Sequence, residues 1–115
     1  MVRFKECFPT SKISEIEGRI PAAKKFILGL LDEPAELIDD IECMSDAEIE
    51  EGLRLGGGHG LYLEPKTIKI NPHMSSVAIL LNYIHENIHH VLPEASENLV
   101  DHLTDLVAYQ MGINR

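Results

Sequence analysis

The chain has 115 residues, of which 44% are hydrophobic, so it is long enough for one globular domain and too hydrophobic for a disordered chain. A formal net charge of −9 and the lack of a dense basic patch argue against nucleic-acid binding, because an acidic surface repels phosphate backbones. No apolar run approaches the roughly 18–20 residues of a membrane span, and the stretch MVRFKECFPT lacks the apolar core of a signal peptide. We therefore expect a soluble, cytoplasmic, single-domain protein over residues 1–115.

Two helices are predicted in the N-terminal part of the chain. Ile13 and Ile16 share a helical face, which predicts a short helix over residues 11–17. A second helix is predicted over about 21–33, because its apolar residues recur at helical spacing and Pro21 fits the first turn, where the missing N–H of proline costs nothing.

A strand and a capped helix are predicted next. Residues 36–44 alternate imperfectly between polar and apolar side chains, as a strand does. Ser45 and Glu48 have the spacing of a capping box, which predicts a short helix that continues to about Leu53.

The two cysteines, Cys7 and Cys43, stand alone in the sequence, without a C-x-x-C partner. In a cytoplasmic chain we expect two reduced and mostly buried thiols, and a disulfide or a metal-binding role are the alternatives.

The second half of the chain predicts a hairpin followed by two helices. Residues 60–72 alternate apolar and polar side chains on both sides of an EPKT turn. From about Ser75 the apolar residues recur every 3.6 residues, which predicts one helix to about Val91 and a second from about Pro93 to about Met111. The order of helices, strands and two further helices predicts an α+β fold.

A possible metal-binding motif lies on the first of these two helices. His85, Glu86 and His89 spell H-E-x-x-H. At about 100° per residue, His89 lies about 40° round the helix from His85, so both imidazoles point the same way, beside the apolar face. Two imidazoles at this spacing can share one Zn2+ ion, and the neighbouring carboxylate can accept a proton from a zinc-activated water. The alternative without function is a solvated His/Glu face on an amphipathic helix.

The third metal ligand is expected on the second helix. The connection between the two helices is short, so they should be antiparallel neighbours, and the start of the second helix should lie beside His89. Glu97 is then the preferred ligand. Asp101, one turn further on and roughly level with His85, is the alternative. Whichever of the two is not a ligand is expected to accept the second N–H of a ligand histidine and so fix its tautomer.

Five other residues have weaker functional interpretations. Surface positions, a helix end or packing roles are expected for His90, His102 and Tyr109, with stabilisation of an oxyanion as the alternative for the latter two. His73 is expected in a loop before the helix. His59 lies in a glycine-rich loop, from which it could approach the rim of the cleft or make a contact in a latent form.

The segments LYLEPKTIKINP and LLNYIHENIHHVLPEASENLVDHLTDLVAY cover about half of the chain and resemble a zincin metallopeptidase. The resemblance is to a minimal gluzincin (minigluzincin) or a similar short SprT-like domain. It implies a backing helix and a small twisted sheet above the H-E-x-x-H helix, and a C-terminal helix whose glutamate is the third ligand. It also implies that Gly60–Glu64 binds substrate as an edge strand, by main-chain pairing.

The chain also departs from known members of this class. It has no downstream glutamate at the longer spacing common in larger gluzincins, and no third histidine at metzincin spacing. It lacks the zinc ribbon and the basic tail of DNA-linked SprT-like proteins, which disfavours a role on DNA.

The leading hypothesis is therefore a zinc-dependent peptidase that acts on a peptide or protein substrate. Zn2+ would be held by His85, His89 and Glu97, with Glu86 as the general base. A chain this short has little material for specificity pockets, so it would be latent, very restricted in substrate, or dependent on self-association as a homo-oligomer. The alternative is a catalytically silent zinc-binding module with a regulatory or interaction role. No nucleic-acid or membrane partner is expected.

Overall fold

The computed structural model describes residues 2–31, 34–54, 60–63 and 67–113. This part of the chain forms five helices and one four-stranded sheet, which confirms the predicted α+β class. The elements, in chain order, are β1 (Arg3–Phe4), α1 (Thr10–Glu17), α2 (Ile20–Leu28), β2 (Asp40–Cys43), α3 (Asp46–Arg54), β3 (Gly60–Leu63), β4 (Thr67–Ile70), α4 (Ser76–Val91) and α5 (Glu97–Gln110).

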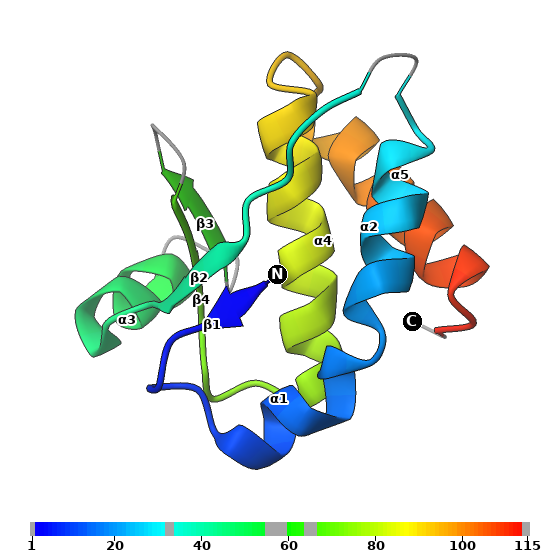
Figure 1. Cartoon of the computed structure of the whole chain (residues 1–115). Coiled ribbons are helices and arrows are strands. Elements are labelled where there is room, and N and C mark those ends of the chain that lie inside the picture. The colour runs from blue at the N-terminus through cyan, green and yellow to red at the C-terminus, as the bar shows by residue number, and fades with distance from the viewer. Residues whose placement is uncertain (1, 32–33, 55–59, 64–66, 114–115) are drawn as a thin grey trace.

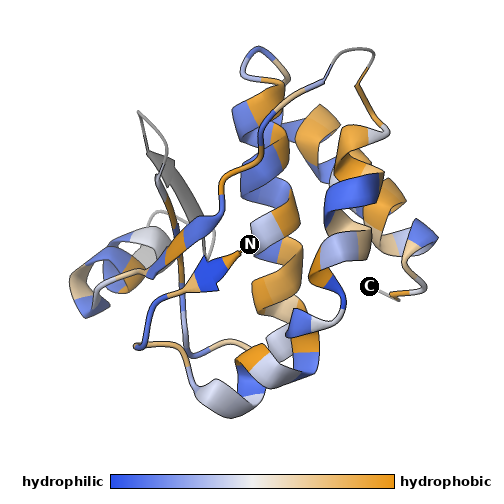
Figure 2. Ribbon diagram, in the orientation of Figure 1, coloured by the Kyte–Doolittle hydropathy of each residue, from blue (hydrophilic) through white to orange (hydrophobic). Residues whose placement is uncertain are grey.

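Helix α4 runs through the middle of the molecule, with the sheet on one side and helices α2 and α5 on the other (Figure 1). Five of its side chains are completely buried and apolar, namely Ile79, Leu80, Tyr83, Ile84 and Ile88. The buried face of this helix is wide, because α1, α2, α5, β3 and β4 all contact it. Figure 2 shows hydrophilic and hydrophobic bands along α2, α4 and α5, as expected of amphipathic helices. Within the described ranges, no helix has the length and apolar character needed to cross a membrane.

The sheet has the strand order β1-β2-β4-β3, with β1, β2 and β4 parallel and β3 antiparallel to β4. The pairing of Tyr62 with Ile68 confirms the predicted hairpin. In β4, Ile68 and Ile70 are completely buried. Lys69 lies between them and its Nζ lies 3.2 Å from Oε2 of Glu48 on α3. The sheet therefore contributes one apolar face to the core.

Local signals in the sequence account for most helix boundaries. The capping box before α3 is confirmed, since the Ser45 N–H donates to Glu48 Oε1 over 2.9 Å and the Glu48 N–H donates to Ser45 Oγ over 3.2 Å. The helix predicted over 21–33 is shorter than expected, because α2 ends at Leu28 with Gly29 as its C-cap. The helix predicted from Pro93 begins instead at Glu97.

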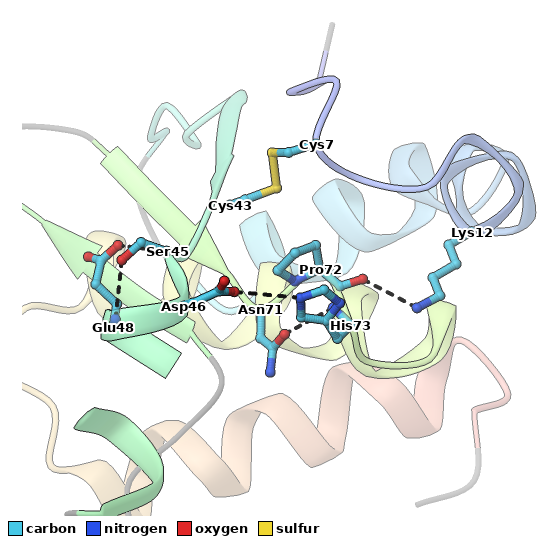
Figure 3. The surroundings of a disulfide bond; sticks show 9 residues. All are labelled: Cys7, Lys12, Cys43, Ser45, Asp46, Glu48, Asn71, Pro72 and His73. Carbon is cyan, nitrogen blue, oxygen red and sulfur yellow. Dashed lines mark hydrogen bonds and ion pairs between the residues drawn. A yellow bond between two sulfur atoms is a disulfide. The ribbon is translucent and has the colours of Figure 1, made fainter. Parts of the chain in front are cut away.

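The expectation of two reduced, mostly buried cysteines is wrong. Cys7 and Cys43 form a disulfide with their Cα atoms 6.3 Å apart, and Cys7 is exposed. The reason is the parallel pairing of β1 with β2, which brings the chain just after β1 alongside the last residue of β2 (Figure 3). The sequence did not predict β1, which is only two residues long, so this proximity was not foreseen.

The segment that leads into β2 is fastened to the back of α4 by Asn87. This side chain is completely buried, and its Oδ1 accepts a 2.7 Å hydrogen bond from the Ile38 N–H. Its Nδ2 donates to the Tyr83 carbonyl over 3.1 Å. One side chain within the H-E-x-x-H sequence thus ties α4 to the chain that crosses it.

We predict that Asn87→Ala lowers the free energy of unfolding by about 1–3 kcal/mol, because the buried Ile38 N–H loses its acceptor. Chemical denaturation measures this difference. The matched control is Asn82→Ala, which removes a partly buried hydrogen bond within α4 from Asn82 Nδ2 to the Ala78 carbonyl. Equal losses in the two variants would contradict the special role of Asn87.

Candidate metal centre

The histidine pair lies on the side of α4 that faces α5. His85 and His89 are one turn apart, with ring centroids separated by 4.8 Å and an angle of 69° between the ring planes. Their Nε2 atoms lie 3.2 Å from each other. Both rings are partly exposed, so the pair borders the core and remains open to solvent.

Helix α5 brings Glu97 to the same point. Ser96 caps the helix by accepting a 3.2 Å hydrogen bond from the Leu99 N–H, which makes Glu97 the first residue of α5. Glu97 Oε1 lies 2.8 Å from His85 Nε2, and Oε2 lies 3.0 Å from His89 Nε2. One ligand atom from each of the three residues lies within 4.8 Å of the others, so this group could hold a metal ion.

The distances in this triangle fit a shared cation. Two atoms that bind one tetrahedral zinc ion at about 2.1 Å are about 3.4 Å apart, so the three side chains need to separate by only a few tenths of an ångström. A purely hydrogen-bonded triangle is less satisfactory. Each Nε2 would need a proton to donate to the carboxylate, which would set two N–H groups against each other at 3.2 Å.

Asp101 lies one turn after Glu97 and contacts the other nitrogen of His85. The distance from Asp101 Oδ1 to His85 Nδ1 is 3.3 Å. A carboxylate at this position favours a proton on Nδ1, which leaves the lone pair of Nε2 free for a metal ion. Of the two carboxylates considered from the sequence, Glu97 therefore lies at the metal-facing nitrogens and Asp101 lies behind His85.

Glu86 lies beside the group and is buried. Its side chain belongs to a residue that is only 6% exposed, and its Oε2 lies 3.9 Å from His85 Nε2. Burial, and to a smaller extent the negative charge of Glu97, raises the pKa of Glu86 to about 7. In the metal-free chain, this carboxyl group can therefore exchange a proton near neutral pH.

The other residues considered from the sequence are not members of this group. Tyr109 is 82% exposed and His102 is also exposed, as expected for surface residues. His90 is in the last turn of α4, and His73 is in the loop before that helix with its Nε2 4.0 Å from Asp46 Oδ1. His59 lies outside the described residues.

Sequence reasoning did not foresee two residues that support the site. Asn87 is invisible to the H-E-x-x-H pattern, which leaves its two middle positions unspecified. Ser96 could have been found, because serine is a preferred N-cap and the helix begins directly after it. Pro93 instead favoured a helix that begins four residues earlier, because proline fits the first turn of a helix.

Comparison of the chain with family models, curated proteins and solved structures gives no match.

We predict that the chain binds one divalent transition-metal ion and that His85→Ala or His89→Ala abolishes tight binding. Each substitution removes one corner of the triangle. His90→Ala is the matched control, because His90 is not one of the three grouped residues. Metal analysis of untagged protein, with chelator competition, checks this. Full occupancy in the double variant His85→Ala, His89→Ala would contradict the site.

Proposed function

We propose that the chain is a zinc-dependent peptidase. The observation that supports this most strongly is the convergence of the His85 and His89 Nε2 atoms on the two carboxylate oxygens of Glu97, with the buried Glu86 alongside. This combination offers a metal site and a separate proton acceptor within one short stretch of two helices.

The donor set favours zinc over other common divalent ions. Two imidazole nitrogens and a carboxylate are a set typical of catalytic zinc, whereas Mg2+ and Ca2+ prefer ligand shells made of oxygen. Three protein ligands also leave a fourth position open. When bound, a zinc ion supplies a Lewis acid that allows a water molecule to ionise near neutral pH.

Glu86 is the proposed general base. It directly follows His85 on α4, beside the side of the helix that carries the two histidines, and it is not one of the three grouped residues. A carboxylate beside the metal site could take a proton from the attacking water and pass it to the departing amine of the cleaved peptide bond. Its burial keeps the carboxylate from being fully solvated, which favours proton transfer over simple hydration.

Asp101 and Asn87 are the proposed supports of this site. Asp101 holds His85 in the tautomer that exposes the Nε2 lone pair. Asn87 acts from the opposite side of α4 through its bond to the Ile38 N–H, which limits movement of the helix that carries both histidines.

The proposed substrate is a peptide or protein segment in extended form. Strand β3 is at the end of the sheet order and contacts α4. An extended peptide can pair with the free edge of such a strand through main-chain hydrogen bonds. The hairpin, the H-E-x-x-H helix and the following helix with Glu97 occur in the order implied by the resemblance to minimal gluzincins, which supports this assignment.

A catalytically silent zinc-binding module is the second candidate. The low exposure of Glu86 favours it, because a base that is 6% exposed has little room to meet a substrate unless the site opens. The first test below separates the two candidates.

We predict that Glu86→Gln keeps zinc but loses peptide hydrolysis by about 10²–10⁴-fold, since an amide cannot act as the base. Cleavage of a peptide library and of a denatured protein measures the activity. Glu94→Gln, a change to an exposed carboxylate in the turn before α5, should leave activity unchanged. Equal activity in the wild type and Glu86→Gln would refute the proposed base, and no activity in either would favour the silent module.

We predict that Asp101→Asn weakens zinc binding by about 10–100-fold, as expected when the partner of a ligand histidine is removed. Glu97→Gln should weaken binding more strongly, because it removes a ligand charge. Competitive titration with a chromophoric chelator gives both values. The order of the two variants would be reversed if Asp101 were the ligand and Glu97 the supporting residue.

A further inference from the structure

The Cys7–Cys43 disulfide belongs to none of the elements that carry the candidate metal centre. Cys43 ends β2, where it pairs with Ile70 of β4. Cys7 lies in the turn between β1 and α1, and it is exposed whereas Cys43 is half-buried. Figure 3 shows the bond joining the N-terminal segment to the end of the strand. Cys7 is therefore more accessible than Cys43 to a reagent in solution.

Strand β1 has little else to hold it in place. It is two residues long, and its pairing includes hydrogen bonds from the Arg3 N–H to the Asp39 carbonyl and from the Lys5 N–H to the Ile41 carbonyl. The Arg3–Asp40 ion pair is bidentate, at 2.8 and 3.1 Å, but its side chains are 75% and 56% exposed, so solvent and salt screen it. A strand this short does not persist on its own pairing.

Most of the core is formed without residues 2–7. Phe8 is the first fully buried residue in the described part of the chain, and α1 and α2 then bury Ile16, Ala23 and Ile27. Before Phe8, only Val2 and Phe4 are partly buried. The Phe4 ring lies 5.4 Å from that of Phe8 and 6.5 Å from that of Tyr83. Detachment of residues 2–7 would therefore uncover part of Phe8 and Tyr83, whereas the contacts of α1 and α2 with α4 would remain.

We propose that the Cys7–Cys43 disulfide is a reducible clasp, a thiol-exchange site whose reduction by a dithiol releases residues 2–7 from β2. In the oxidised chain the covalent bond compensates for the weak pairing of β1. In the reduced chain, the short pairing with β2, the exposed ion pair and the packing of Val2 and Phe4 are left to hold the segment.

The reaction is an ordinary thiol–disulfide exchange. One thiolate of the dithiol attacks the Cys7 sulfur, forming a mixed disulfide and releasing the Cys43 thiolate, which takes up a proton. The second thiolate of the reagent then attacks the reagent's other sulfur, which is bonded to Cys7 in the mixed disulfide. This releases the Cys7 thiolate, which is protonated in turn. The protein gains two electrons and two protons, and the dithiol becomes a cyclic disulfide.

Release of β1 would change the surface of the sheet. The Ile41 backbone would lose its neighbour, and β2 would become an edge with unpaired polar groups. The clasp thus controls whether this side of the sheet can accept another extended segment. This inference does not rest on the proposed peptidase activity, since neither cysteine, β1 nor β2 contributes a residue to the candidate metal centre.

Amide hydrogen exchange of the full chain, measured by NMR before and after treatment with dithiothreitol, tests the clasp. On reduction we expect the exchange rates of the Arg3 and Lys5 amides to rise by about tenfold or more, as in a local opening. The Ile27 and Leu80 amides, in α2 and α4, should change far less. The matched control is the double variant Cys7→Ser, Cys43→Ser, which should exchange like the reduced chain and should not respond to dithiothreitol.

Three results would overturn the proposal. A disulfide that resists dithiothreitol in the folded chain would not be an exchange site. An equal rise in the exchange rates of the Lys5 and Leu80 amides would show that the disulfide stabilises the whole fold and not residues 2–7 alone. Unchanged exchange at Arg3 and Lys5 after confirmed reduction would show that β1 needs no clasp.

Discussion

The short connection between α4 and α5 fixes which side chains of α5 can meet the histidine pair. The chain turns back within residues 92–96, where the Ala95 N–H donates to the Leu92 carbonyl and Ser96 caps the new helix. Glu97 therefore enters α5 at the level of His85 and His89, and Asp101 follows one turn later at the back of His85. A longer connection would leave both the distance and the direction of α5 undetermined. The positions of the carboxylate at the two Nε2 atoms and of the carboxylate at His85 Nδ1 thus follow from one turn and one helical repeat.

The burial of α4 sets the electrostatic character of the group. The sheet covers one side of this helix, and α2 and α5 cover the other, so the histidines lie at the boundary between core and solvent (Figure 1). Glu86 lies on the inner side of that boundary, where loss of solvation raises its pKa. Glu97 is largely exposed on the outer side. The facing helices α4 and α5 therefore bring together a buried carboxyl group suited to proton transfer and an exposed carboxylate suited to binding a cation.

Local signals in the sequence predicted most of the fold. Helical periodicity identified α1, α2, α4 and α5, the Ser45–Glu48 box identified α3, and alternation on both sides of a turn identified the β3–β4 hairpin. These features depend on residues a few positions apart, which a sequence presents directly. Strand β1 has two residues and no alternation to detect, and its pairing partner is more than thirty residues away. The disulfide depends on that pairing, so it was missed for the same reason.

The part of the candidate site that could be predicted is the part that depends on residues close together in the sequence. The i, i+4 spacing of His85 and His89 and the short turn brought both Glu97 and Asp101 within range, with Glu97 preferred and Asp101 as the alternative. The choice depends on side-chain geometry. A glutamate at the first position of α5 reaches two imidazoles on the neighbouring helix, whereas the shorter Asp101 reaches the far side of one ring. The contribution of Asn87 was not foreseen, because Ile38 lies in the part of the predicted 36–44 strand that precedes the observed β2, and its bond to Asn87 joins residues 49 positions apart.

X-ray absorption spectroscopy of the zinc-loaded chain tests the proposed centre most directly, because it reports the atoms around the metal without relying on activity. We expect four nitrogen or oxygen neighbours at about 2.0–2.1 Å, with the multiple scattering of two imidazole rings. A spectrum with one imidazole or none, or with sulfur in the first shell, would contradict a centre built from His85, His89 and Glu97.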